Sequence, residues 1–345
     1  MRFELSIVLF AVTSLWAQNQ ARFGAQIPVD TSVLGNVVQV TTDGASRKPH
    51  WSGDGKKLMV ISSEGGKCPQ AYWMDPATKE RKLASSGKGS VRSAVPLVKS
   101  KSWIYDSTQD AGDACAPTML GSVPAAFNIF MSNEKGKVQR LASAEGYDAD
   151  VDVSTSEKLI VYTSQASGDI EVWTMEWDGM NKRQLTHAVG YDGDPNVSGD
   201  GRRIVFRSSR VRQLDAQKQV KDELAFGRAQ MAPSEIYVMS LKGGDEKQIT
   251  SFGCTLLHPA WTPDNRRIVF SSNLPSCTGA RFELFMVNLD GTELVQLTKG
   301  SKFVGEASFS PDGRTVAYTK DGDIYKADWL AMAPPPETLS PLSKP

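Results

Sequence analysis

The sequence has no excess of charge of either sign, because 39 lysines and arginines are balanced by 39 aspartates and glutamates among its 345 residues. A protein that binds nucleic acid or an anionic membrane surface broadly needs a basic excess. We therefore expect no nucleic-acid partner.

Long apolar runs are also scarce, and beyond the N-terminus none reaches the length of a membrane span. The run Leu5–Trp16 is too short for a span, follows the basic Arg2 and precedes the small Ala17. This pattern is typical of a secretory signal peptide over residues 1–17. We predict a periplasmic or secreted protein that does not span the membrane and is associated with the cell envelope. A buried N-terminal segment is the alternative.

Cysteine is sparse, and its four copies are Cys68, Cys115, Cys254 and Cys277. An even number in an exported chain fits two disulfides. Their spacing matches no zinc motif. Free, buried cysteines remain the alternative. We expect no cofactor other than a bound cation, which is considered below.

One repeated unit runs along the chain. Its clearest copies begin at Pro49, Pro195, Pro259 and Ala307, and weaker copies begin at Pro96 and Val151. In the clear copies a short strand reaches a Ser-Pro-Asp-Gly type of turn, whose residues favour a tight reversal of the chain. A more continuously apolar strand follows each turn, as expected for a strand buried on both faces.

Each unit continues with a third strand that has an aromatic centre and, in most copies, a short fourth strand that ends in threonine or alanine. Four antiparallel strands per repeat describe a propeller blade. The sixth unit has no fourth strand after Tyr325, whereas Val38–Thr41 ahead of the first unit has the fourth-strand pattern. We therefore predict an all-β, six-bladed β-propeller of four-stranded antiparallel blades, closed by an N-terminal strand that completes the last blade.

The repeats resemble those of the TolB-like β-propellers over roughly residues 37–327. The similarity is clearest in Gly190–Pro195, Ser234–Met239 and Pro259–Asp264. It implies the fold but not one function, since similar propellers serve as periplasmic adaptors and as accessory domains of peptidases. The expected organisation is a signal peptide at 1–17, a lead-in at 18–36, the propeller at 37–330 and a Pro-rich tail at 331–345.

The propeller model places one residue of each unit, just before the first strand, at the mouth of the central channel. These residues are Lys48, Val95, Asp150, Asp194, His258 and Glu306, and Asp148 and Asp192 lie one step earlier. We expect a locally acidic mouth that binds a cation such as Ca²⁺, an amine or a basic peptide. Alternatively, these acids accept hydrogen bonds from backbone amides at the strand entrances. In the binding interpretation, replacing Asp150 and Asp194 by Asn leaves the fold intact.

The same model pairs the cysteines. Cys68 and Cys115 fall in equivalent loops of neighbouring blades, and Cys254 and Cys277 flank the first two strands of the fifth blade. We predict Cys68–Cys115 and Cys254–Cys277 disulfides.

No catalytic signature accompanies these residues. The sequence has three histidines, and it has no Gly-x-Ser-x-Gly nucleophile motif. A metal site of His258 with Asp150 and Asp194 is geometrically compatible, but no ligand spacing requires it.

Two further features bear on function. Residues 210–228 form a long insertion with a helix-like stretch that contains the apolar residues Leu214, Val220, Leu224 and Phe226. This insertion is either a lid or docking helix beside the channel or a segment that only packs on the rim. The repeated tryptophans favour packing between blades over sugar binding.

The leading hypothesis is an exported scaffold that recognises a protein or peptide partner at the channel mouth. A hydrolase or metal-dependent lyase that uses the mouth, and a binder of carbohydrate or envelope polymer, are the alternatives.

Overall fold

The computed structural model describes residues 27–331 except 99, 118–121, 125, 143–145, 212 and 230–232. The expected signal peptide (1–17) and all of the expected tail (331–345) except Ala331 lie outside the described residues.

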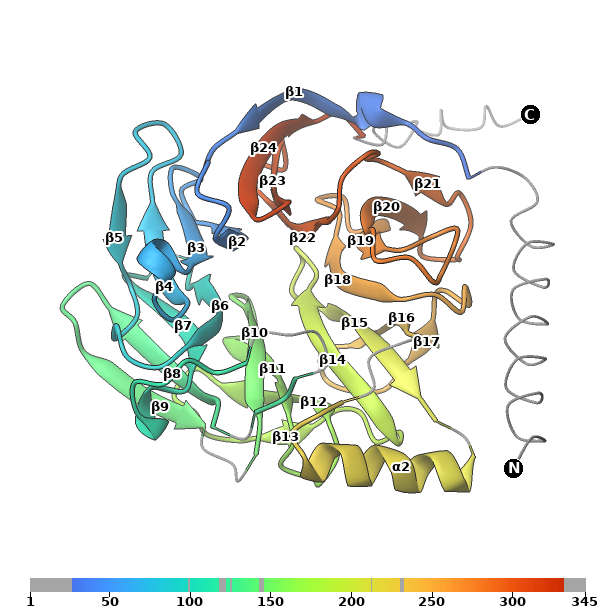
Figure 1. Cartoon of the computed structure of the whole chain (residues 1–345), viewed down its shortest axis with the longest axis horizontal. Coiled ribbons are helices and arrows are strands. Elements are labelled where there is room, and N and C mark those ends of the chain that lie inside the picture. The colour runs from blue at the N-terminus through green and yellow to red at the C-terminus, as the bar shows by residue number, and fades with distance from the viewer. Residues whose placement is uncertain are drawn as a thin grey trace, which may run out of the picture.

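The chain forms six four-stranded antiparallel sheets around a common axis (Figure 1). Blade 1 contains β2 (Ser46–Trp51), β3 (Leu58–Ser62), β4 (Gln70–Met74) and β5 (Arg81–Leu83). Blade 2 contains β6 (Val91–Pro96), β7 (Ser102–Ser107), β8 (Asn128–Asn133) and β9 (Val138–Ala142). Blade 3 contains β10 (Asp148–Ser154), β11 (Leu159–Ser164), β12 (Glu171–Glu176) and β13 (Arg183–Gln184).

The second half of the ring repeats this order. Blade 4 contains β14 (Gly190–Val197), β15 (Arg203–Arg210), β16 (Glu235–Ser240) and β17 (Lys247–Gln248). Blade 5 contains β18 (Leu256–Trp261), β19 (Arg267–Ser272), β20 (Glu283–Asn288) and β21 (Val295–Gln296). Blade 6 contains β22 (Val304–Phe309), β23 (Thr315–Lys320), β24 (Asp323–Trp329) and β1 (Leu34–Gln39).

The predicted fold class is therefore confirmed, including the closure of the ring. β1 pairs antiparallel with β24, for example Gln39 with Tyr325, so the first strand of the chain completes the last blade. β1 begins at Leu34, slightly before the expected start at residue 37.

The core lies mainly between blades. The second strands are buried except at some of their ends, and Leu58–Ser62 is buried along its whole length, because both faces of each blade pack against neighbouring blades. In one cluster Val205 of blade 4 packs with Phe270 and Phe285 of blade 5, and all three are fully buried. The aromatic residues of the repeat thus stabilise the contact of one blade with the next.

The turn signature has a direct physical role. In blade 1 the Ser52 hydroxyl donates to Asp54 Oδ1 at 2.6 Å, and the same carboxylate accepts the Lys56 amide at 3.1 Å. Blade 4 repeats both bonds with Ser198, Asp200 and Arg202. The aspartate side chain closes the turn, which is why it recurs at this position.

A second repeated motif joins the third and fourth strands. The Thr186 hydroxyl donates to Glu171 at 2.5 Å and accepts the Val172 amide at 2.9 Å. The same threonine–acid motif pairs Thr250 with Glu235, Thr298 with Glu283, and Thr41 with Asp323. Because Thr41 is near the start of the chain and Asp323 near its end, this motif fastens the ring closure.

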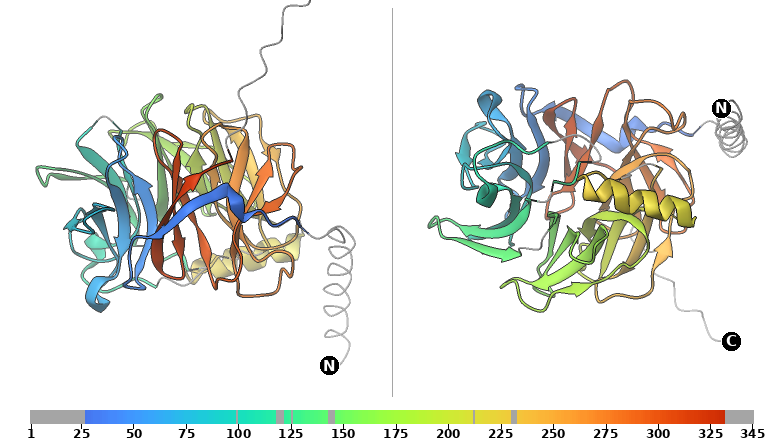
Figure 2. Two further views of the ribbon diagram at one scale, coloured as in Figure 1. Left: turned by 90° about the horizontal axis from the view of Figure 1, so that it is seen from above. Right: turned by 60° about the horizontal axis from the view of Figure 1, so that its bottom comes forward.

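Two disulfides and one α-helix lie on a single face of the ring, to which the loops between second and third strands belong. Cys68 is bonded to Cys115 and Cys254 to Cys277, as predicted. α2 (Leu214–Ala225) is inserted between β15 and β16 and covers part of this face (Figure 2). The short 3-10 helices of the chain are η1 (Thr31–Val33), η2 (Glu64–Gly66) and η3 (Gln109–Ala111).

The predicted apolar stripe of the insertion is partly correct. Val220 and Leu224 are buried, but Phe226 is 74% exposed because the helix has already ended. Gly227 follows with φ of +67°, a conformation that suits glycine at a helix C-terminus. We refer below to this face as the α2 face and to the opposite one as the open face.

The closure predicts a strong effect of N-terminal truncation. A chain that begins at residue 42 lacks β1 and Thr41, so it loses several hydrogen bonds and exposes the edge of β24. We expect the free energy of unfolding to fall by about 3 kcal/mol or more, measured by chemical denaturation. A chain that begins at residue 31 keeps β1 and serves as the control. Equal stability of the two chains would contradict closure by β1.

The threonine–acid motif predicts a pH effect at Glu171. Burial raises the pKa of Glu171 to about 8, and Asp192 and Asp169 act in the same direction. The protonated acid is therefore favoured in the folded state, so its contribution to stability is full at low pH and is lost as pH rises through 8. We expect the melting temperature of Glu171→Gln, relative to the unmodified protein, to increase from pH 5 to pH 8.5. A difference that is independent of pH would show that Glu171 titrates normally.

Candidate functional site

A β-bulge in the innermost strand of each blade directs side chains toward the channel. The pairing of β10 with β11, for example, shifts between Ala149 and Asp152. The bulged residues Lys48, Asp150, Asp194, His258 and Glu306 all have positive φ, between 49° and 56°. They occupy the same position in five blades, as the sequence predicted.

The bulge frees a backbone amide that the neighbouring blade satisfies. The Lys48 amide donates to Glu306 Oε2 at 2.9 Å, and the Asp150 amide donates to Asp106 Oδ2 at 2.9 Å. The Asp194 amide donates to the Thr163 hydroxyl at 3.3 Å. The interpretation of these acids as acceptors for strand-entrance amides therefore holds for Glu306.

Blade 2 departs from the expected alignment. Its bulge lies between Val91 and Ala94, which places Ser93 at the channel position instead of Val95. The prediction of Val95 was wrong because Lys99–Ser102 lacks the turn signature that marks the strand end in the clear repeats.

The expected acidity of the mouth is wrong in one respect, because cations within the ring balance the carboxylates. Arg207 Nε lies 2.5 Å from Asp194 Oδ2, and the side chains are only 2% and 7% exposed. Lys48 Nζ lies 2.9 Å from Asp150 Oδ1, and Arg92 lies 3.6 Å from the same oxygen. Neither Arg92 nor Arg207 was singled out from the sequence.

These cations set the ionisation of the acids. Burial alone would raise the pKa of Asp194, but the attraction of Arg207, His258 and Lys48 lowers it well below its usual range. Burial also acts to raise the pKa of Asp150, but the attraction of Lys48 acts in the opposite direction and the pKa is lowered overall. Both carboxylates are therefore ionised and paired at neutral pH.

His258 lies between two of the acids. Its Nδ1 is 3.6 Å from Asp194 Oδ2 and its Nε2 is 3.7 Å from Glu306 Oε1. Burial lowers the pKa of His258, although Asp194 and Glu306 act in the opposite direction. At 22% its side chain is the most exposed of this charged group.

Asp148 and Asp192 do not join the charged group at the channel. Both are buried at the start of their strands, where Ser164 donates to Asp148 at 2.5 Å and Arg210 donates to Asp192 at 3.1 Å. They stand before the bulge, so their side chains are held within their own blades. This corrects their assignment as channel residues.

The α2 face of the channel is covered. Tyr147 and Tyr191 are 0% and 2% exposed and pack in one apolar cluster with Val220 and Leu224 of α2. The Tyr147 hydroxyl donates to Asp150 at 2.8 Å.

The loop between β7 and β8 joins this cover. The Val123 amide donates to Gly227 at 2.9 Å, and Arg92 donates to the Ser122 carbonyl at 2.9 Å. Described residues of α2 and of this loop therefore cover the mouth at which we expected a ligand to enter.

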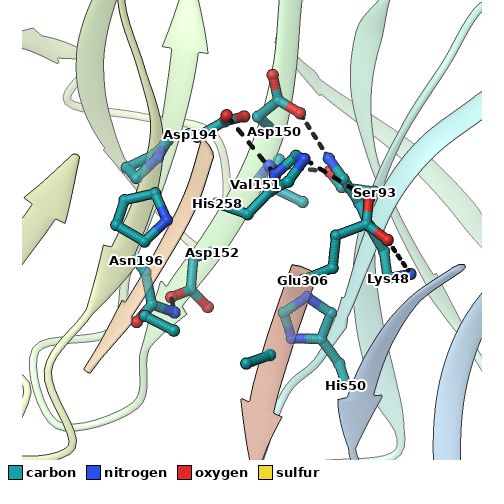
Figure 3. A pocket seen from close by; sticks show the side chains of 14 residues that line it. Lys48, His50, Ser93, Asp150, Val151, Asp152, Asp194, Asn196, His258 and Glu306 are labelled. Carbon is teal, nitrogen blue, oxygen red and sulfur yellow. Dashed lines mark hydrogen bonds and ion pairs between the residues drawn. The ribbon is translucent and has the colours of Figure 1, made fainter. Parts of the chain in front are cut away.

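A polar cavity lies beneath the charged group (Figure 3). It is lined by Lys48, Asp150, Asp194, His258 and Glu306, and it continues to residues two positions further along the first strands, His50, Asp152 and Asn196. The cavity thus extends toward the open face. About 70 Å³ is open to the centre of a water molecule, which corresponds to roughly five waters.

The end of the cavity nearer the open face has a neutral histidine and a hydrogen-bonded carboxylate. Burial and Lys48 lower the pKa of His50 to about 4, so its imidazole is neutral at pH 7. Burial raises the pKa of Asp152 to about 6, and its carboxylate accepts the Asn196 amide group at 2.9 Å. At pH 7 this end of the cavity therefore presents a neutral imidazole, a neutral amide and the largely ionised Asp152 beside the balanced ion pairs.

The described residues give less support to the other kinds of site, a metal centre or a sugar-binding surface. Within them, no three His, Cys, Asp or Glu side chains gather as metal ligands. The indole groups of Trp51 and Trp261 donate to the backbone of adjacent blades, which supports the packing role of the repeated tryptophans. None of the helices in the described ranges has the length and apolarity to cross a membrane.

Solved structures with the same architecture cover most of the chain. A putative TolB from Agrobacterium tumefaciens aligns with a TM-score of 0.59 at 17% identity, over 85% of this chain and 96% of that one. The fold is that of the TolB-like β-propellers. No family model and no curated protein sequence matches the chain.

Two enzymes also align with the chain over most of its length. A gluconolactonase from Xanthomonas campestris aligns with a TM-score of 0.59 at 11% identity, over 88% of this chain and 94% of that one. The tricorn protease aligns with a TM-score of 0.57 at 16% identity, over 82% of this chain but 25% of that one. At these identities the comparisons show the fold alone.

The buried ion pair reverses the expected effect of changing the channel acids. Asp194→Asn leaves the Arg207 guanidinium buried without its carboxylate, which costs about 3–5 kcal/mol in comparable pairs. We expect a loss of stability of this size in urea unfolding, and a smaller loss when Asp194→Leu is combined with Arg207→Met. If the free energy of unfolding of Asp194→Asn is within about 1 kcal/mol of that of the unmodified protein, Asp194 is available for a ligand.

Proposed function

We propose that this protein is an exported binding module that holds a protein or peptide partner at the open face of the propeller. The observation that carries the proposal is the polar cavity on the channel axis, which extends toward the open face, while α2 and residues of the β7–β8 loop cover the other end.

The size of the cavity favours a small part of a larger partner. Space for a few waters accommodates the tip of one side chain or a chain end, but not a whole drug-sized ligand. His50 and Asn196 present neutral polar groups at its wall, and Lys48 stands behind them. Most of the contact area of a partner would then lie on the turns around the cavity.

The charged group supports binding over catalysis. General acid–base chemistry needs a group whose pKa lies near the working pH. The carboxylates of Asp150 and Asp194 are instead held ionised by Lys48 and Arg207. Their role in this proposal is to fix the shape of the cavity wall.

A hydrolase or lyase is the second candidate because of one observation. His258 reaches two carboxylates and is the most exposed member of the charged group. An enzyme that used it would lose activity in His258→Gln, whereas a binding module would keep its partner unless the cavity changed shape.

Export is part of the proposal. The expected signal peptide and the two disulfides both fit an oxidising compartment, either the periplasm or the exterior. Association with the cell envelope would follow from the partner. A bound cation such as Ca²⁺ stays a prediction.

Site-specific photo-crosslinking tests which face binds a partner. A benzophenone side chain at Lys57, in the β2–β3 turn of the open face, should give a protein adduct in intact cells. The same group at Lys221, an exposed position on α2, is the matched control and should give little adduct. Adducts from Lys221 alone would move the binding site to the α2 face. Adducts from neither position would contradict a protein partner.

A further inference from the structure

The open face carries a ring of short turns around the channel. Because every first strand runs from the α2 face to the open face, the six turns between first and second strands all lie at the open end. We call these the inner turns, and they span residues 52–57, 97–101, 155–158, 198–202, 262–266 and 310–314.

The inner turns form a nearly continuous ring. A Cβ at Gly55 of blade 1 would lie 3.6 Å from Pro311 of blade 6, and one at Gly53 would lie 2.9 Å from Val98 of blade 2. The Gly199 amide of blade 4 donates to Asn265 of blade 5 at 2.7 Å. A partner on this face would therefore contact several blades at once.

The bases of the inner turns face solvent. Each of the six turns carries at least one lysine or arginine, and the exposed ones are Lys56, Lys57, Lys101, Lys158, Arg202, Arg266 and Arg314. Of these, only Lys101 has an ion pair among the described residues, to the exposed Glu134.

The aspartates of these turns are used internally. Asp312 Oδ1 accepts the Ser310 hydroxyl at 2.6 Å and the Arg314 amide at 3.1 Å, and Asp264 makes the same pair of bonds with Thr262 and Arg266. Their carboxylates are directed into the turns, and the neighbouring basic side chains are left to the surface.

The outer turns, between third and fourth strands, have a different character. In blade 5 they carry Asp290 and Glu293 without a base, and in blade 4 Asp245 and Glu246 outnumber Lys242. The inner turns therefore carry more basic than acidic residues, whereas the outer turns of blades 4 and 5 carry more acidic than basic ones. Such a pattern attracts an anionic group to the channel axis and orients it there.

We propose that the inner turns dock an acidic segment of the partner protein, centred on the channel opening. This inference rests on the proposed function and adds the chemistry of the partner. Carboxylates of the segment would pair with Lys56, Arg202, Arg266 and Arg314 around the ring. The cavity beyond His50 then takes an uncharged side chain or chain end of the same segment.

A charge-reversal pair of variants tests the ring. The first variant changes Lys56, Arg202, Arg266 and Arg314 to Glu. The matched control changes Lys79, Lys135, Lys137 and Lys182 of the outer turns to Glu, so that both variants have the same net charge. The probe is a fluorescein-labelled peptide of ten glutamates, with binding measured by anisotropy at 20 mM and 300 mM NaCl.

We expect the unmodified protein to bind the peptide at low salt and much more weakly at high salt, because exposed charges are screened. The inner-turn variant should lose at least about tenfold in affinity and the outer-turn control less than about twofold. Equal losses would overturn the proposal, since net charge and not the ring would then govern binding. Absence of peptide binding by the unmodified protein would overturn it as well.

Anionic vesicles of phosphatidylglycerol separate a membrane surface from a peptide. Binding to vesicles without binding to the peptide would overturn the proposal in favour of a lipid surface. The crosslinking experiment at Lys57 reports a partner of any charge. If Lys57 gives adducts but the glutamate peptide does not bind, the acidic segment is rejected and the proposed function stays intact.

Discussion

The structure depends on one constraint, the β-bulge in the innermost strand of each blade. A residue with an L side chain in the left-handed region costs about 1–2 kcal/mol, and this chain accepts that conformation at five channel positions. The bulge directs a long polar side chain toward the channel. It also leaves a backbone amide without a partner in its own sheet, so the preceding blade must provide a hydrogen-bond acceptor. Thr163, Asp106 and Thr319 provide those acceptors from the second strands. Blade-to-blade contact at the axis is thus polar, whereas further out it is apolar.

Charge balance at the axis follows from the same constraint. Inward carboxylates in a narrow, poorly hydrated space repel one another unless cations lie between them. Arg207 and Arg92 supply such cations from within the ring, and Lys48 supplies a third from a bulge position. Because Arg92 also holds the Ser122 carbonyl, the ion pairs are connected to the loop that covers the α2 face. The charged group is therefore a structural element as well as the wall of the cavity.

The repeat made the ring and the channel positions predictable, because each turn signature fixes where a first strand ends. Counting back from it located Asp150, Asp194, His258, Glu306 and Lys48. The method failed in blade 2, where the signature is missing, and the register shifted from Val95 to Ser93. Arg207 and Arg92 were not found, because neither occupies the repeated channel position: Arg207 lies in the second strand of blade 4, and Arg92 directly precedes Ser93 in blade 2. One signal was present: Arg207 interrupts the apolar strand Arg203–Arg210 at a position that must be buried.

The unequal construction of the two faces bears on which of them binds. The α2 face is built from long connections, and the bond between Cys68 and Cys115 ties two of them together. Those connections pack on Tyr147 and Tyr191, so a partner there would have to displace a buried apolar cluster. The open face is built from tight turns that are closed by their own Ser–Asp hydrogen bonds. Such turns are ordered before a partner arrives, and binding to them costs little additional conformational entropy. The same motif that defines the repeat in the sequence therefore also preorganises the surface on which a partner is best accommodated.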